Sequence, residues 1–241
     1  MNREWEAQAR NWLAWARTPG HDAYWHYAPA FFRDVVPPPS GRTLEIGAGE
    51  GRVTRDLRDS GHSVTAVDTA PTLLREAAAA DPSSTYVLSD GAALPFADES
   101  FALVVAYNSL MDVDDMPATV AEASRVLTRD GSFCVCVTHP VNDAGEFEGQ
   151  DEDARFTIDG SYFGRRAFHG TVERDGLQMT FSGRLYDLES YATAFERAGL
   201  VIERVREPQP DDHAVAARSE LARWRRVPMF LFARLRKRAV G

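Results

Sequence analysis

The clearest sign of chemistry in the sequence is a glycine-rich segment, Gly47-Ala48-Gly49-Glu50-Gly51. Glycine lets the backbone turn sharply and approach a ligand closely, because no Cβ stands in the way. Asp68 follows 17 positions after Gly51, at the end of an apolar run, and a carboxylate there can accept hydrogen bonds from both hydroxyls of a ribose. Together the two features predict a site for a nucleoside-containing cofactor.

Arg52, directly after the glycine segment, indicates what kind of cofactor this is. The dinucleotide fingerprint G-x-G-x-x-G has a small third residue at this position, where a helix packs beside a pyrophosphate. Here Gly51 comes one residue early, and no Gly-Lys-Ser/Thr sequence of a Walker loop follows. A guanidinium at the helix start can instead pair with a carboxylate. The spacing favours a ribose plus an amino-acid tail over a ribose plus a diphosphate.

The segments around these residues alternate between strand and helix patterns. Strands are predicted at 43–46, 64–67, 86–88, 101–107, 133–137, 201–205 and 227–233. Helices are predicted at 52–60, 71–80, 116–127, 188–198 and near 212–224. This alternation predicts an α/β fold with a doubly wound, Rossmann-like parallel sheet. Ligands of such sheets bind beyond the carboxyl ends of the strands, where the glycine segment lies.

Two segments fall outside this alternation. Residues 1–36 contain four of the five tryptophans and precede a Pro37-Pro38-Pro39 linker, so we expect a helical aromatic lid before a main domain at 37–241. Plain packing against the core is the alternative. Residues 140–186 contain a predicted β-hairpin around Asp175-Gly176, a pair that favours a type I′ turn. We expect this insertion to cap the substrate, with its acidic stretch 143–153 as an exposed loop.

Composition narrows the class of protein. The 241 residues are 44% hydrophobic and 26% charged, which suits one α/β domain. The formal net charge of −9 disfavours a nucleic-acid surface, and no run approaches the about 18 apolar residues of a membrane span. Cys134 and Cys136 alternate in an apolar strand, which predicts reduced thiols and no metal site. We expect a cytoplasmic protein with no membrane or nucleic-acid partner; no pattern indicates an oligomeric state.

Four motifs resemble those of class I S-adenosylmethionine-dependent methyltransferases of the small-molecule, type 11-like kind. They are Leu44–Arg52, Val67-Asp68, Ser89–Phe96 and Ser100–Val105. The resemblance implies S-adenosylmethionine as the cofactor and a seven-stranded sheet whose last strand is antiparallel. It implies that Gly47, Gly49 and Gly51 approach the methionine part, that Asp68 holds the ribose, that Asp90 accepts from the adenine amino group and that Asn108 lines the methionine end. Glu45, Arg52, Thr69 and Gly91 complete the expected cofactor-binding set.

His139 is the candidate for a catalytic base. It follows the fifth predicted strand, beside the point where acceptor and sulfonium should meet, and a neutral imidazole can accept a proton. A purely structural hydrogen-bonding histidine is the alternative. The residues expected to line the substrate are aromatic residues and a histidine from the two outlying segments: His21, Tyr24, Trp25, Tyr27, Tyr162, Phe163 and Phe168.

Three functions fit these patterns. The first is methyl transfer from S-adenosylmethionine to an apolar or aromatic small molecule, giving S-adenosylhomocysteine. The second is a protein of this type that binds the cofactor but catalyses another reaction, such as a cyclisation, or only binds. The third is a protein or nucleic-acid methyltransferase. The acidic charge balance, and the absence of an Asn/Asp-Pro-Pro-aromatic run after the fourth strand, favour the first.

Overall fold

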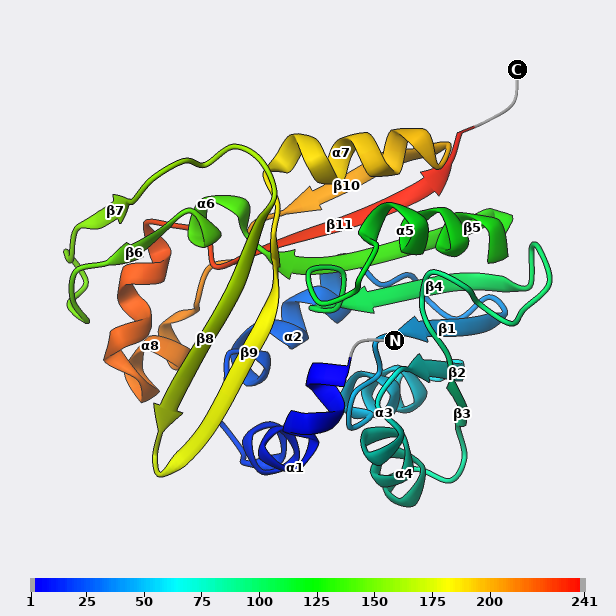
Figure 1. The fold of residues 1–241 in the computed structure, drawn as a ribbon, viewed down its shortest axis with the longest axis horizontal. Helices are drawn as coiled ribbons and strands as arrows, with labels where there is room; N and C mark the ends of the chain where they lie inside the picture. Colours follow the sequence, from blue (N-terminus) through cyan, green and yellow to red (C-terminus); the bar gives the residue numbers. More distant parts are fainter. Residues whose placement is uncertain (1–2, 239–241) are drawn as a thin grey trace.

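Seven strands form the central sheet of the computed structural model, which describes residues 3–238. They are β1 (Arg42–Ile46), β2 (Ser63–Asp68), β3 (Thr85–Leu88), β4 (Phe101–Tyr107), β5 (Leu127–Thr138), β10 (Leu200–Arg206) and β11 (Phe230–Lys237). Their order is β10-β11-β5-β4-β1-β2-β3 (Figure 1). β11 pairs antiparallel with β5 and β10, and the other pairs are parallel. The predicted sheet, including its antiparallel last strand, is confirmed.

Helices cover both faces of this sheet. They include α3 (Arg52–Asp59), α4 (Pro71–Ala80), α5 (Met116–Val126) and α7 (Leu188–Arg197). Between β10 and β11 the chain also forms α8 (Asp212–Ala217) and a 3-10 helix at Ser219–Arg225. Consecutive residues of β4 point to opposite faces of the sheet. Val104 packs in the core formed with α5 and α7, whereas Leu103 packs in the core formed with α3. A strand buried on both faces requires this near-continuous apolar sequence. Within residues 3–238, no helix is long and apolar enough to cross a membrane.

The N-terminal segment forms two helices with different positions, α1 (Arg3–Arg17) and α2 (Tyr24–Asp34). α2 belongs to the core: Phe31 is 0% exposed, and its ring centroid lies 5.0 Å from that of Tyr107 and 5.2 Å from that of Phe232. This differs from the expectation that residues 1–36 form a separate lid. The apolar residues of α2 recur at helical spacing, but Pro29 inside the helix obscures that pattern in the sequence.

Residues 140–186 form a short helix and two small antiparallel sheets. They contain α6 (Pro140–Asp143), β6 (Gly145–Phe147), β7 (Phe156–Ile158), β8 (Arg166–Arg174) and β9 (Leu177–Leu185). The predicted hairpin turns at Asp175-Gly176, and both residues have the positive φ of a type I′ turn, 52° and 76°. β6 occupies part of the acidic stretch 143–153, which therefore is not entirely loop.

The β8–β9 hairpin crosses the edge to which the parallel strands point, and α1 lies against β9 (Figure 1). The ring of Phe181 on β9 makes edge contacts with Trp12 and Trp15 of α1, at centroid distances of 6.4 and 5.9 Å. We call α1 and the β8–β9 hairpin together the roof. The roof covers the carboxyl edge of the sheet, where the sequence predicts the ligand site.

If α2 is core, Phe31→Ala should lower the free energy of unfolding by about 3–5 kcal/mol, because it removes a fully buried ring. Urea denaturation measures this. The neighbouring Phe32 is only partly buried, so Phe32→Ala is the matched control and should cost clearly less. A loss below about 1 kcal/mol for Phe31→Ala would show that α2 does not belong to the core.

Candidate functional site

A cavity of about 480 Å³ lies beyond the carboxyl ends of β1, β2, β4 and β5. The roof contributes Trp5 and Trp12 from α1 and Phe168 and Phe181 from the hairpin to its walls. A partly enclosed, largely apolar cleft at this edge is where a sheet of this type binds its ligand.

The loops after β1 and β4 approach each other closely at Gly47. The residue has a φ of +79°, and a Cβ there would overlap that of Ser109. The Ser109 hydroxyl donates to the Ile46 carbonyl at 2.7 Å, and the Gly47 N–H donates to the Val67 carbonyl at 2.9 Å. Glycine is therefore required at this position by both backbone conformation and space.

Asp68 is held in place by backbone donors. Its Oδ2 accepts from the Gly49 N–H at 2.7 Å and its Oδ1 from the Ala70 N–H at 2.8 Å. Burial raises the pKa of this carboxyl, and the backbone hydrogen bonds oppose that rise. The Thr69 backbone also donates to this carboxylate. A carboxylate has about four lone-pair sites, so Asp68 can still accept a hydrogen bond from a ligand hydroxyl without moving.

Glu45 is a second buried acid in the cavity wall. Burial raises its pKa to about 8, and the Thr54 hydroxyl, which donates to the carboxylate, opposes the rise. The hydrogen bond from Thr54 holds the Glu45 side chain in the cavity wall.

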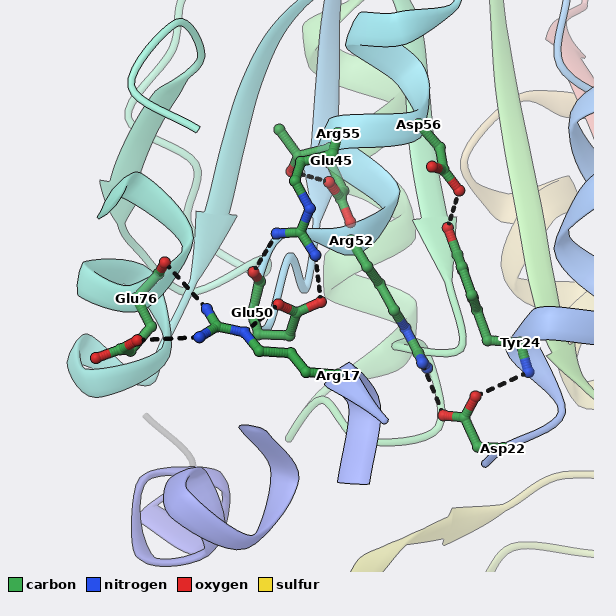
Figure 2. Close-up of polar contacts among 10 residues, drawn as sticks. Arg17, Asp22, Tyr24, Glu45, Glu50, Arg52, Arg55, Asp56 and Glu76 are labelled. Carbon is green, nitrogen blue, oxygen red and sulfur yellow. Dashed lines mark hydrogen bonds and ion pairs between the residues drawn. The ribbon is translucent and has the colours of Figure 1, made fainter. Parts of the chain in front are cut away.

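Arg52 lines the cavity but is already paired within the chain (Figure 2). A terminal guanidinium nitrogen lies 2.7 Å from Asp22 Oδ2. The guanidinium carbon lies 4.1 Å from the Tyr24 ring centroid and 4.9 Å from that of Trp12. A guanidinium offers five donors, so Arg52 can hold Asp22 and still donate to a ligand carboxylate.

Arg17 fastens the roof to the glycine segment (Figure 2). Its Nε lies 3.0 Å from a Glu50 carboxylate oxygen, and another of its nitrogens lies 3.2 Å from Glu76 of α4. Glu50 also pairs with Arg55 at 2.7 Å. The Glu50 side chain is only 1% exposed, and two arginines supply the compensation that a buried carboxylate needs.

Most of the expected cofactor-binding residues meet in this cavity. Those that line it are Glu45, Gly47, Gly49, Arg52, Asp68, Thr69, Asp90, Gly91 and Asn108. Gly51 is not in the wall; it precedes α3 with a φ of 84°. Their roles towards a cofactor remain predictions.

The expected substrate set is mostly elsewhere, and only Phe168 among its members lines the cavity. Tyr24 and Tyr27 are buried in the α2 core, and Trp25 and Phe163 are exposed. The Tyr162 hydroxyl accepts from the Leu188 N–H at 3.2 Å. His21 packs its ring edge-on against Trp15, with the centroids 4.3 Å apart. Besides Phe168, the aromatic side chains of the roof that line the cavity are Trp5, Trp12 and Phe181, which were not in the expected substrate set.

His139 also lies outside the cavity wall. Its Nδ1 accepts from the Val141 N–H at 3.1 Å and so caps α6, and its Nε2 lies 2.9 Å from Glu207. Burial lowers the pKa of the imidazole, and Glu207 opposes this. The geometry matches the structural alternative for His139, since both ring nitrogens serve the fold.

The structure adds acids to the cavity wall that were not in the expected site set, among them Asp112 after β4 and Asp143 at the end of α6. Burial raises the pKa of Asp143 to about 6, against the effect of the Thr138 hydroxyl and Arg166. The pKa of Asp112 is raised well above its ordinary value by burial and by the nearby carboxylates. Their only sequence signal is that each follows a strand end. Across the described part of the chain, no group of three or more His, Cys, Asp or Glu side chains could hold a metal ion.

Comparison with known proteins finds similarity to methyltransferases. Residues 44–135 match the family described as "Methyltransferase domain". The chain is 32% identical over 123 residues to a demethylmenaquinone methyltransferase of Tropheryma whipplei, covering 49% of this chain and 50% of that protein. It is 36% identical over 104 residues to a malonyl-[acyl-carrier protein] O-methyltransferase of Halorhodospira halophila, covering 41% and 35%. The matches thus span half or less of these curated relatives.

A solved structure matches over most of the chain. It is an S-adenosylmethionine-dependent methyltransferase from Mesorhizobium loti, similar with a TM-score of 0.72 and 26% identity, over 90% of this chain and 98% of that one. The similarity therefore extends well beyond the matched residues 44–135.

Gly47→Ala should destabilise the chain by about 2–5 kcal/mol, because it combines left-handed backbone strain with a clash against Ser109. Gly176→Ala is the matched control: it has a similar φ of +76°, but nothing lies within 4 Å of an added Cβ. Urea denaturation of the two variants separates the clash from the strain. Equal losses would mean that the loops after β1 and β4 are not in close contact.

Proposed function

The chain belongs to the class I S-adenosylmethionine-dependent methyltransferase family, and from this premise we propose that it transfers a methyl group from S-adenosylmethionine to a small-molecule acceptor. The observation that carries the proposal is the pairing of the Gly47–Gly51 segment with Asp68 in one cavity wall, joined by the Gly49–Asp68 hydrogen bond. S-adenosylmethionine supplies a methyl group already activated on a sulfonium.

The residues present fit this cofactor. Asp68 offers fixed acceptors for ribose hydroxyls, and Asp90 lies in the same wall as an acceptor for an amino group. Arg52 offers donors to a carboxylate beside its partner Asp22. Aromatic rings of the roof, including Trp12, can face a cation. Nucleoside and amino-acid parts thus have complementary groups within one cavity.

The remaining task of the protein is to align the acceptor and to exclude water. The roof closes the cavity from the side opposite the strand ends, which favours acceptors small enough to fit beneath it. The names of the two curated relatives point to a quinone precursor and to a malonyl group on a carrier protein. They support methyl transfer and leave the acceptor of this chain to be identified.

The decisive experiment supplies S-adenosylmethionine with a labelled methyl group together with a metabolite extract, an RNA pool or a protein pool. Label should appear in the small-molecule fraction. Label in RNA or protein instead would redirect the proposal to a macromolecular acceptor. Cofactor binding without label in any pool would support a reaction other than methylation.

S-adenosylhomocysteine at about 100 times its Kd should raise the melting temperature by about 5–10 °C, because it binds the native state alone. NAD at the same concentration should not, since the glycine segment lacks the dinucleotide spacing. Differential scanning fluorimetry measures both. A shift with NAD and none with S-adenosylhomocysteine would reject the cofactor assignment.

Asp68→Asn should lower affinity for S-adenosylhomocysteine about 10- to 150-fold, because it removes charge-assisted hydrogen bonds to the ribose. Titration calorimetry measures the affinity. Asp159→Asn, which changes an exposed acid of the insertion, is the matched control and should bind like the parent. An unchanged affinity in a folded Asp68→Asn protein would contradict the ribose contact.

A further inference from the structure

A second cavity, of about 420 Å³, is lined by β6, by the loop after β6 and by the 3-10 helix at Ser219–Arg225. In Figure 1, β6 lies beside the orange helical segment that follows β10. The walls of the two cavities share Asn142 and Gly145, so the cavities adjoin at α6 and the start of β6. An inference from this second cavity rests on the proposed function and concerns the chemical class of the methyl acceptor.

Arg223 of the 3-10 helix contributes a positive charge to the wall of the second cavity. Its guanidinium carbon lies 5.3 Å from the Phe147 ring centroid and 5.7 Å from that of Trp224, and the two rings meet edge-on at 5.0 Å. Its Nη1 donates to the Gly149 carbonyl at 2.7 Å and to the side-chain oxygen of Gln150. The guanidinium is thus held by aromatic rings and by neutral oxygen atoms.

In the part of the chain that the structure describes, the charge of Arg223 has no carboxylate partner, and its Nε has no hydrogen-bond acceptor. Burial lowers the pKa of this guanidinium, the charge of Glu220 opposes that effect, and Arg174 adds to it. Glu220 is itself paired with Arg218 at 2.6 Å. Because an arginine stays protonated at neutral pH, a partly buried positive charge remains without compensation, and an anion would supply it.

Two acids, Glu146 and Glu148, also border the second cavity. Successive side chains of a strand point to opposite faces, and Phe147 between the two acids faces Arg223. The carboxylates therefore point to the other face, where both residues are exposed and Glu148 accepts from the Thr157 hydroxyl at 2.9 Å. They do not neutralise the guanidinium.

We propose that the second cavity binds the carboxylate of the methyl acceptor, so that the acceptor is an elongated acid whose other end lies beneath the roof. A guanidinium has five N–H donors, and the two bonds from Nη1 of Arg223 leave those on Nη2 and Nε. The Asn142 amide, whose bond to the Met229 carbonyl is long at 3.4 Å, offers further donors. The rings of Phe147 and Trp224 supply apolar surface for the carbon atoms next to the carboxylate.

This arrangement also determines which group receives the methyl. The residues proposed to bind the cofactor line the first cavity, whereas Arg223 lines the second. A carboxylate held by Arg223 is therefore kept away from the sulfonium. The methylated atom belongs to the opposite end of the acceptor, and the carboxylate serves to orient the molecule.

The test measures binding of phenylalkanoates to protein saturated with S-adenosylhomocysteine, by titration calorimetry. The probes are phenylacetate, 4-phenylbutyrate, 6-phenylhexanoate and 8-phenyloctanoate, each with its matched alcohol. The longer acids should bind at least about 10-fold more tightly than their alcohols, because the carboxylate gains charge-assisted hydrogen bonds. Affinity should also rise from phenylacetate to the longer acids, because only a long acid fills both cavities.

Arg223→Gln should reduce the affinity for the longer acids about 10- to 100-fold and leave the alcohols unchanged. Arg226→Gln is the matched control. Arg226 likewise holds the loop after β6, through the carbonyls of Glu152 and Ala154, but it lies outside both cavity walls. This control should keep the preference for acids, and both variants should bind S-adenosylhomocysteine like the parent.

The proposal is overturned if the longer acids bind no better than their alcohols, or if the two arginine variants lose acid affinity equally. Equal binding of phenylacetate and the longer acids would also overturn it, because the second cavity would then be a separate site. Should Arg223→Gln fail to unfold cooperatively, the comparison of acids with alcohols on the parent protein decides. Failure of S-adenosylhomocysteine to bind would count against the proposed function alone, because the same probes can be measured in its absence.

Discussion

The site depends on one close approach, that of the loop after β1 to the loop after β4 at Gly47. Because no side chain separates them, the Ser109 hydroxyl reaches the Ile46 carbonyl, and the loop after β1 stays hydrogen-bonded to the end of β2 through the Val67 carbonyl. Asp68 then lies within reach of the Gly49 N–H. A larger residue at position 47 would push apart the loops after β1 and β4, which line the same cavity.

Ion pairs connect the carboxyl edge of the sheet to the roof. Glu50 is the buried acid within the glycine segment, and it pairs with Arg17 of α1 and Arg55 of α3. Removing one partner of a buried pair leaves an uncompensated charge, so the position of α1 is coupled energetically to the loop beneath it. Arg52 likewise has contacts on both sides. Asp22 and the rings of Tyr24 and Trp12 orient its guanidinium, which also lines the cavity.

The sequence predicted the sheet well because strands and helix caps have local signals, and most of the residues expected to bind the cofactor line one cavity. Strand β4 was predicted with its observed bounds, Phe101–Tyr107. The sequence predicted less well which side chains line the cavity, because this depends on the direction that the chain takes after each strand. The single turn of α6 directs Asp143 into the cavity and engages His139 as its cap, although the two residues are close in sequence. Similarly, the aromatic pattern before residue 36 could not distinguish α1 over the cavity from α2 in the core.

The roof joins parts of the chain that are made at different times. Trp12 and Trp15 of α1 leave the ribosome long before Phe181, their ring partner on β9. Closing so long a loop costs chain entropy that local helices and neighbouring strands avoid. During synthesis, the tryptophan face of α1 therefore lacks its partner Phe181 while the first strands pair, and it is covered only after the β8–β9 hairpin has been made. Vectorial synthesis thus gives the nascent chain an interval in which an aromatic surface is exposed to chaperones and to other unfinished chains.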